Sequence, residues 1–387
     1  MENFYFYNPT KIYFGEGSIS EMGKELVNVG KNILITYGGG SIKKNGIYDS
    51  AIEILKKLDK NIYELSGIMP NPRTTKVLEG VELCKKHNID FILAIGGGST
   101  IDCTKAIASA FYMDDPDNFF KELYLENKPI KKALPFGSIA TMASTGSEMD
   151  EGGVISDWEN NMKMGYLNEL LFPKFSILDP TYTYSMPIDQ TVYGTIDIIS
   201  HVLEIYFSEP DTPTVSDAMA EGFLKNVFEN LEIVIKDPKN YIARANLLWS
   251  SAMALNGIFK ASKKQDWLGH MIEHALSAYY DIPHGAGLAI AHPAYLKYIC
   301  QNKPTKFARY ARNVWGITEG TEKELAIKGL EKTSQFFKSV GAPITLKEVG
   351  IGTDRLDEVI EKIVLYPTSY SNLDKQDLKN IILSCAE

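Results

Sequence analysis

Two short apolar segments, each followed by a glycine-rich turn, most constrain the fold of this chain. Residues 32–37 (NILITY) run directly into Gly38-Gly39-Gly40-Ser41, and residues 91–95 (FILAI) run into Gly96-Gly97-Gly98-Ser99. Further segments with strand or helix periodicity fill the same region: residues 46–58, 61–65, 74–87 and 100–111. This alternation of strands and helices predicts a parallel, doubly wound sheet that binds its ligand beyond the carboxyl ends of the strands.

After Pro187 the pattern changes to long helical segments with almost no β-branched alternation. We therefore expect an α/β domain over residues 1–185 and an all-helical domain over residues 186–387. The length of 387 residues, with 44% hydrophobic and 23% charged residues, is sufficient for two or three domains with a large core.

Composition excludes several classes of protein. A net charge of -9 argues against a nucleic-acid surface, which needs clustered lysine and arginine. The sequence lacks both a run of roughly 18 to 20 apolar residues that could span a membrane and an N-terminal signal peptide. The four cysteines are widely spaced, without a C-x2-C pair, and are expected to be reduced packing residues. These features predict a cytoplasmic protein with no nucleic-acid or membrane partner.

The histidines are crowded into one part of the chain. Of six histidines, five lie between residues 201 and 292. Asp197 precedes His201 by four residues, His270 precedes His274 by four, and His284 follows. Such spacing places both side chains of a pair on one face of a helix, about 6 Å apart at their β-carbons. A carboxylate with imidazoles and no thiolate favours Fe(II) or Zn(II), although an isolated pair more often lies on a solvated helix face.

Glycine-rich turns after strands are suited to phosphate binding, because glycine allows close approach and the next helix offers free N–H groups. Gly97-Gly98-Ser99 is the stronger candidate, and residues 141–148 (TMASTGSE) form a third polar loop. Neither glycine run completes the G-x-G-x-x-G fingerprint, and no P-loop is present. Each loop alone is equally compatible with an ordinary turn.

Taken together, the ordered motifs GGGS-x2-D-x2-K (96–105), STGSE (144–148), LDP (178–180), D-x3-H (197–201) and GHMIEHALSAYYDIPHGAGLA (269–289) resemble the iron-containing (group III) alcohol dehydrogenase family. Residues 37–49, 64–73 and 243–257 resemble its butanol dehydrogenase and broad aldehyde reductase branch. The resemblance extends over nearly the whole chain. It implies an N-terminal dinucleotide-binding domain, a helical metal domain and a cleft between them for the nicotinamide and one divalent metal, Fe2+ or Zn2+.

The resemblance also assigns residues. It implies that the metal ligands are Asp197, His201, His270 and His284, a choice over His274 that spacing alone does not make. It implies a catalytic proton-relay role for His274, one turn from His270. The positions that it implies for cofactor binding are Gly38, Gly39, Gly40, Ser41, Asn71, Gly97, Gly98, Ser99, Asp102, Thr141, Ser144, Thr145, Ser147, Lys163, Leu178 and Tyr182. His87 and His292 match no motif and are expected to be structural.

Reversible hydride transfer between NAD(P)(H) and a small primary alcohol or aldehyde, such as butanol or butanal, is the predicted activity, in a homodimer. A polyol-phosphate dehydrogenase or dehydroquinate-synthase-like lyase would need a basic pocket. The segment near the ligands instead offers Trp267, Tyr279, Tyr280 and Ile282. A non-catalytic metal or nucleotide sensor is the third alternative. The loop at residues 38–41 lacks an acid that would repel a 2′-phosphate, which predicts a preference for NADP(H), with NAD(H) also possible.

Overall fold

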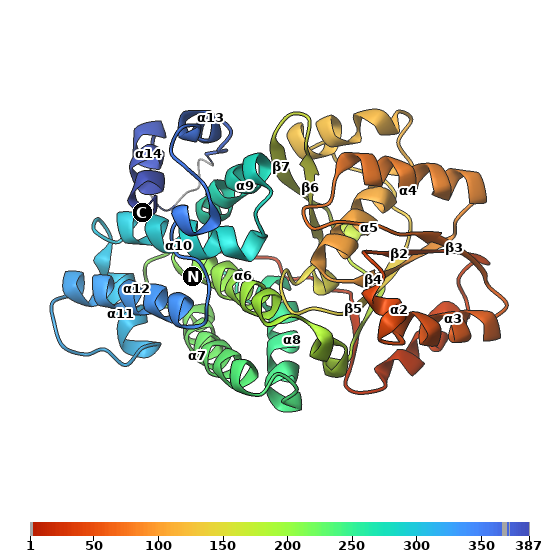
Figure 1. Ribbon diagram of the computed structural model, residues 1–387, viewed down its shortest axis with the longest axis horizontal. Coiled ribbons are helices and arrows are strands. Elements are labelled where there is room, and N and C mark those ends of the chain that lie inside the picture. The colour runs from red at the N-terminus through yellow and green to blue at the C-terminus, as the bar shows by residue number, and fades with distance from the viewer. Residues whose placement is uncertain (1–2, 366–369, 371, 387) are drawn as a thin grey trace. The chain divides into compact units, whose positions relative to one another are not determined.

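The computed structural model describes residues 3–365, 370 and 372–386, and the chain forms two compact units (Figure 1). The sheet unit consists of Tyr7–Met186 and Lys239–Asn256. The helical unit consists of Met1–Phe6, Pro187–Pro238 and Gly257–Glu387. An α/β part and an all-helical part were both expected from the sequence, and this class of fold is confirmed.

A six-stranded parallel sheet forms the sheet unit, in the order β1-β8-β5-β4-β2-β3. Its strands are β1 (Lys11–Phe14), β2 (Asn32–Tyr37), β3 (Asn61–Leu65), β4 (Phe91–Gly96), β5 (Phe136–Ala140) and β8 (Phe175–Leu178). An antiparallel hairpin of β6 (Gly152–Asp157) and β7 (Met162–Leu167) lies outside this sheet. The predicted strands at β2, β3 and β4 are confirmed, whereas β1, β8 and the hairpin were not anticipated.

Helices cover both faces of the sheet. On one face pack α1 (Met22–Leu26), α2 (Ser41–Lys44) and α3 (Ile47–Lys57). On the other pack α4 (Thr74–His87) and α5 (Gly98–Ala110), as Figure 1 shows. β2 and β4 are neighbours, and the helices that follow them lie on opposite faces of the sheet. Ligands of doubly wound sheets bind at such a point.

Helix α8 (Tyr241–Leu255) belongs to the sheet unit although it lies far along the chain. Its Leu248 and Ala252 pack against Ala140 of β5 and Leu178 of β8. The units therefore differ from the expected segments 1–185 and 186–387 in residues 1–6, 186 and 239–256. The reason is a tertiary contact of α8 that local periodicity does not encode.

The helical unit begins at α6 (Ile188–Tyr206), which follows Pro187 and is buried along nearly its whole length. Helix α10 (His284–Ile299) packs against both α6 and α9 (Leu268–Tyr280). The other helices are α7 (Val215–Lys236), α11 (Pro304–Asn313), α12 (Glu322–Ser339), α13 (Leu356–Glu361) and α14 (Lys375–Ser384). Across the described residues, none of the helices combines the length and apolar character required for a membrane span.

Short single turns complete the fold. The 3-10 turns are Ser18–Glu21, Pro116–Asn118, Ser147–Met149, Glu169–Leu171, Pro180–Ser185 and Lys347–Val349, and Phe120–Leu125 forms a π-helical turn.

Candidate functional site

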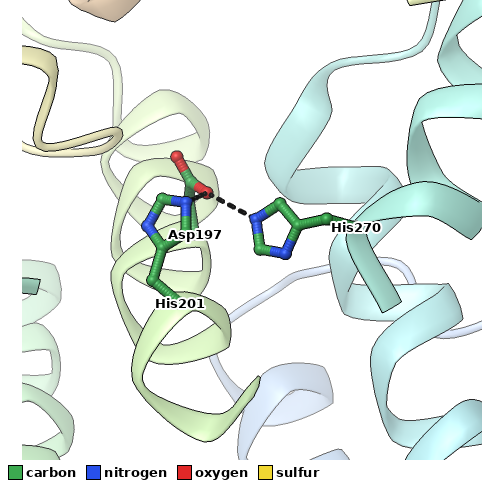
Figure 2. A group of neighbouring side chains, drawn as sticks. All are labelled: Asp197, His201 and His270. Carbon is green, nitrogen blue, oxygen red and sulfur yellow. Dashed lines mark ion pairs between the residues drawn. The ribbon is translucent and has the colours of Figure 1, made fainter. Parts of the chain in front are cut away.

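Three imidazoles of the helical unit converge on one carboxylate oxygen. The Oδ1 of Asp197 lies 3.4 Å from Nε2 of His201, 3.6 Å from Nε2 of His270 and 3.4 Å from Nε2 of His284. Figure 2 shows Asp197 and His201 on one helix, with His270 directed at them from a second. The structure thus brings together the four residues that the resemblance proposed as metal ligands.

Local sequence explains how the four side chains meet. Asp197 and His201 are one turn apart on α6, so they project from the same face. His270 lies in the first turn of α9, which ends at Asp281 in the left-handed conformation with φ of 51°. Pro283 then caps α10, and His284 is the first residue of that helix. The tight turn between α9 and α10 returns His284 toward His270.

Burial differs among the four side chains. The side chain of Asp197 is 1% exposed and those of His201 and His270 are each 6% exposed, whereas that of His284 is 23% exposed. A buried carboxylate is costly unless it is paired or bound to a cation. His284 is therefore the most solvent-exposed of the four side chains.

Two further carboxylates lie behind the imidazoles and were not found from the sequence. The Nδ1 of His270 is hydrogen-bonded to Glu204, and the Nδ1 of His284 is hydrogen-bonded to Glu273. A carboxylate only accepts, so these contacts place the ring hydrogen on Nδ1 and leave the Nε2 lone pair for a cation. Spacing could have indicated both, because Glu204 is two turns after Asp197 and Glu273 is one turn after His270.

Charge within the cluster shifts its titration. Burial favours a neutral Asp197, yet the neighbouring His201 and His284 hold the pKa of its carboxyl well below the usual range. Burial also favours the neutral form of His201, and it lowers the pKa of that imidazole to about 3. Glu204 and Asp197 outweigh burial at His270 and raise its pKa to about 10. Without a cation, His270 is therefore protonated on both ring nitrogens at neutral pH.

The ring of His201 is held by packing. Its Nδ1 is buried and has no hydrogen-bond partner among the described residues. The ring stacks on His270 with centroids 4.7 Å apart, and Trp267 meets it at 69° with centroids 6.1 Å apart. Trp267 also meets His270, with centroids 5.5 Å apart. The three imidazoles are consequently oriented in two ways, two by carboxylates and one by aromatic neighbours.

His274 lies beside the cluster. Its ring centroid is 5.6 Å from that of His284 and 6.2 Å from that of His270. A ligand-capable nitrogen of His274 lies within 4.8 Å of corresponding atoms of Glu273 and His284, while Asp197 groups in the same way with His201 and His270. The structure therefore places His274 next to His270 and His284.

The other two histidines lie in different surroundings. His87, in the last turn of α4, stacks on Tyr63 with centroids 4.1 Å apart. His292 is fully buried on α10 behind Gly269. A β-carbon at residue 269 would lie 2.7 Å from both Glu204 Oε1 and His292 Cδ2. Glycine before His270 therefore lets α9 approach the carboxylate that orients the imidazole.

The donor set suits a divalent transition metal. One carboxylate oxygen and three imidazole nitrogens match Fe(II) or Zn(II), and hard cations such as Ca(II) prefer more oxygen ligands. Outer carboxylates on metal-binding histidines are a usual feature of such centres. The residues present therefore fit the divalent metal that the sequence suggested.

The predicted cofactor residues lie in the sheet unit, mostly beyond the carboxyl ends of adjacent strands. They are Gly38, Gly39, Gly40 and Ser41 after β2; Asn71 after β3; Gly97, Gly98, Ser99 and Asp102 after β4; Thr141, Ser144, Thr145 and Ser147 after β5; and Leu178 and Tyr182 at and after the end of β8. Lys163 is the exception, on β7 of the hairpin. Parallel strands thus collect these residues along one edge of the sheet, which we call the cofactor edge.

Asp102 organises part of this edge. Its carboxylate accepts hydrogen bonds from Ser147 Oγ at 2.6 Å and from the amide of Val154 at 3.1 Å. Burial raises the pKa of Asp102 to about 6. Lys105, on the same helix, bonds Asp150 Oδ1 at 2.5 Å and the carbonyl of Gly152 at 2.6 Å. Asp102 and Lys105 therefore fix the loop after β5 and the hairpin against α5.

The loop after β2 is next to a paired lysine. Lys43 Nζ lies 3.1 Å from Glu64 Oε2 and 4.3 Å above the ring of Tyr48. Tyr37 and Tyr48 each donate to the same carboxylate at 2.6 Å. Glu64 lies on β3, so the sequence of residues 38–44 did not reveal this carboxylate. The contact of Glu64 with Lys43 partly neutralises the positive charge beside the loop.

One arginine lies near the aromatic side chains that follow His274 in the sequence. The guanidinium of Arg355 is 5.0 Å from the ring centroid of Tyr279. It also pairs with Glu358 at 3.0 Å, and both side chains are largely exposed. Arg355 was not anticipated from the sequence. The negative charge of Glu358 offsets the positive charge of Arg355 that would be needed to attract an anionic substrate.

Comparison with known proteins agrees with this geometry. Residues 9–180 match the family described as iron-containing alcohol dehydrogenase, and residues 191–386 match the C-terminal part of the Fe-containing alcohol dehydrogenase family. The chain belongs to the iron-containing alcohol dehydrogenase family and is an oxidoreductase.

Individual relatives place it in one branch of that family. NADH-dependent butanol dehydrogenase A of Clostridium acetobutylicum is 46% identical, covering 94% of this chain and 93% of the relative. NADPH-dependent aldehyde reductase YqhD of Escherichia coli is 36% identical over the same shares. The crystal structure of NADH-dependent butanol dehydrogenase A from Thermotoga maritima has a TM-score of 0.96 at 39% identity, covering 100% of this chain and 99% of that one. The resemblance to the butanol dehydrogenase branch is therefore confirmed.

Proposed function

We propose that this protein reduces small aldehydes, and oxidises the corresponding primary alcohols, at a divalent metal held by Asp197, His201, His270 and His284. The observation that carries the proposal is the approach of three Nε2 atoms to one Asp197 oxygen, two of them on rings backed by Glu204 and Glu273. Neither a structural ion pair nor a solvated helix face requires that arrangement.

Different residues of the chain would hold the metal, bind the dinucleotide and transfer the proton. A divalent cation bound there supplies Lewis-acid stabilisation of negative charge on the substrate oxygen during hydride transfer. Glu204 and Glu273 keep the Nε2 lone pairs of His270 and His284 available. The cofactor edge binds the dinucleotide, with its phosphates on Gly97, Gly98 and Ser99. His274 carries the alcohol proton between substrate and solvent.

A neutral, apolar substrate fits the surroundings of the ligands best. Trp267 packs on two of the imidazoles, and Ile282 is buried next to the turn that places His284. The nearby Arg355 is paired with Glu358. A phosphorylated polyol would lack an unpaired cation in this segment, so we propose butanal-sized aldehydes rather than anionic substrates.

Both nicotinamide cofactors are proposed to be accepted. Residues 38–41 offer no carboxylate against a 2′-phosphate, but Lys43 is committed to Glu64 and so favours that phosphate less than a free lysine would. Relatives include proteins named for NADH and one named for NADPH. The preference for NADP(H) stays a prediction, as do the choice between iron and zinc, the homodimer and the cytoplasmic location.

Absorbance at 340 nm tests the proposed reaction directly. Butanal is supplied with NADH or with NADPH to protein reconstituted with Fe2+ or Zn2+, and to chelated protein whose metal content is measured. We expect turnover only in the metal-loaded samples. Equal turnover in protein shown to be metal-free would refute the metal-dependent reaction, and binding of metal and dinucleotide without any turnover would favour the sensor.

A further inference from the structure

Helix α8 touches the loop after β5 through one buried hydroxyl. Ser251 Oγ accepts a hydrogen bond from the amide of Ser144 at 3.0 Å and donates one to Glu148 Oε1 at 2.7 Å. Ser251 is fully buried and Glu148 is 2% exposed. One side chain from α8 thus joins the two ends of the segment 144–148, which is part of the cofactor edge that the proposed function assigns to the dinucleotide.

The middle of this segment also depends on α8. Gly146 has φ of 73°, and a β-carbon there would lie 2.7 Å from the carbonyl oxygen of Ser251. Backbone in that region of φ favours glycine, and no side chain fits between the loop and the helix. The same residue of α8 therefore contacts the loop through its hydroxyl and limits it through its carbonyl.

Further contacts fix the base of the loop on the sheet and the end of α8. Ser176 Oγ donates to the carbonyl of Glu148 at 2.6 Å. Asn8 Nδ2 donates to the carbonyls of Met149 at 2.8 Å and Asn256 at 3.1 Å. Because the base is anchored independently, the loss of the Ser251 contacts is expected to loosen segment 144–148 without unfolding the sheet unit.

We infer that Ser251 and Glu148 are positioning residues for the dinucleotide, which hold segment 144–148 in the conformation that binds the cofactor. The inference rests on the proposed function of that segment. It gives α8, a helix inserted from the later part of the chain, a specific role in cofactor binding. Neither residue needs to touch the dinucleotide, since each acts through the loop.

Dinucleotide affinity of the metal-free protein provides the first test. NADH or NADPH is added stepwise to wild type, to Ser251→Ala and to the matched control Ser250→Ala, and binding is followed by fluorescence. Ser250→Ala removes a buried hydroxyl from the same helix. We expect Ser251→Ala to weaken binding roughly tenfold, the scale of one lost buried hydrogen-bond partner, and the control to stay within about twofold of wild type. Melting temperature and circular dichroism verify that each variant is folded.

Kinetics separate positioning from general destabilisation. In the metal-loaded enzyme, Ser251→Ala should raise KM for the dinucleotide and leave KM for butanal and metal content near wild type. A second pair keeps the test decisive if Ser251→Ala fails to fold: Glu148→Gln retains an oxygen that accepts from Ser251 and should lose clearly less affinity than Glu148→Ala.

The outcomes are distinguishable. If wild type binds a dinucleotide but Ser251→Ala matches Ser250→Ala, or Glu148→Gln matches Glu148→Ala, the inference is overturned and the proposed function stands. If wild type binds neither dinucleotide, both are overturned. A proportional loss of dinucleotide binding, metal and stability in Ser251→Ala would show a merely structural role and would also overturn the inference.

Discussion

The candidate metal centre is assembled from long ionisable side chains on three buried helices, whereas the cofactor edge consists largely of turns containing glycine, serine and threonine. The first concentrates charge, with Asp197, Glu204 and Glu273 around three imidazoles. The second offers backbone amides and short hydroxyls. A small cation requires fixed lone pairs, but a dinucleotide requires close backbone approach along its phosphates. Perturbing either region should therefore leave the other's ligand bound.

Removing a metal ligand should have the largest effect and tests this independence. We expect His201→Ala and His270→Ala to lose bound metal and turnover, because each removes one of four donors. Dinucleotide affinity should stay within about threefold of wild type, since the phosphate loops lie in the sheet unit. Metal analysis, the 340 nm assay and dinucleotide titration give the three readouts. Full metal and full activity in either variant would contradict the ligand assignment.

His274→Ala should have a smaller effect of a different kind. A lost proton-transfer group slows turnover by roughly 10- to 1,000-fold, while the metal stays bound. The measurement pairs kcat with metal content in the same preparation, and His87→Ala serves as a control because that ring stacks on Tyr63 within the sheet unit. Loss of metal from His274→Ala would instead make His274 a ligand.

Glu204→Gln sharpens the comparison by changing pH dependence. The metal-free His270, with its pKa raised to about 10, must release a proton before Nε2 can bind a cation. Wild-type metal affinity should therefore rise with pH between about 6.5 and 10. The stabilisation that protonated His270 gives the metal-free fold runs in the opposite sense: it is complete below the unfolded pKa and is lost through the same window.

In Glu204→Gln the carboxylate that raises the pKa of His270 is gone, so the slope of metal affinity against pH should flatten. At pH 9 the variant should bind metal roughly 10- to 100-fold more weakly than wild type, the usual cost of losing an outer carboxylate. The difference in metal affinity between variant and wild type should be smaller at pH 7. Chelator competition across this range measures the affinity of each protein and its slope against pH. An unchanged slope would show that Glu204 does not control the protonation of His270.

The two regions also differ in how far the sequence predicts them. Strands β2 and β4 were predicted well because each is a largely apolar run that ends at glycine, and β3 was predicted from a shorter run that includes Ile62, Tyr63 and Leu65. The edge strand β1 and the short strand β8 have only four residues each, too few for a periodic signal. The i, i+4 spacing correctly placed Asp197 and His201 on one face of one helix, but it paired His270 with His274 and gave no reason to prefer His284.

Contacts made across long stretches of chain were not predictable in this way. Ser251 meets Glu148 although 103 positions separate them, and Glu204 meets His270 across 66. Such pairs carry no local pattern, and only the tertiary fold brings their atoms together. The same reason explains why local sequence assigned α8 to the helical segment and did not reveal the contact of Lys43 with Glu64, on the strand beside β2.

Cofactor preference gives the smallest expected effect and tests the cofactor edge alone. An aspartate in the loop after β2 should repel a 2′-phosphate. Gly38→Asp is the direct form of this test, but a β-carbon there would lie 3.1 Å from the carbonyl oxygen of Ile68, whereas one at Gly39 meets nothing within 4 Å. Gly39→Asp therefore tests the effect of the negative charge with less steric disturbance, and Gly39→Asn is its uncharged control.

We expect the ratio of kcat/KM for NADPH to that for NADH to fall at least about tenfold in Gly39→Asp and to change little in Gly39→Asn, with metal content unaltered in both. A wild-type preference for NADH of about tenfold or more would refute the predicted NADP(H) preference, and an unchanged ratio in the aspartate variant would show that the 2′-phosphate does not lie at this loop.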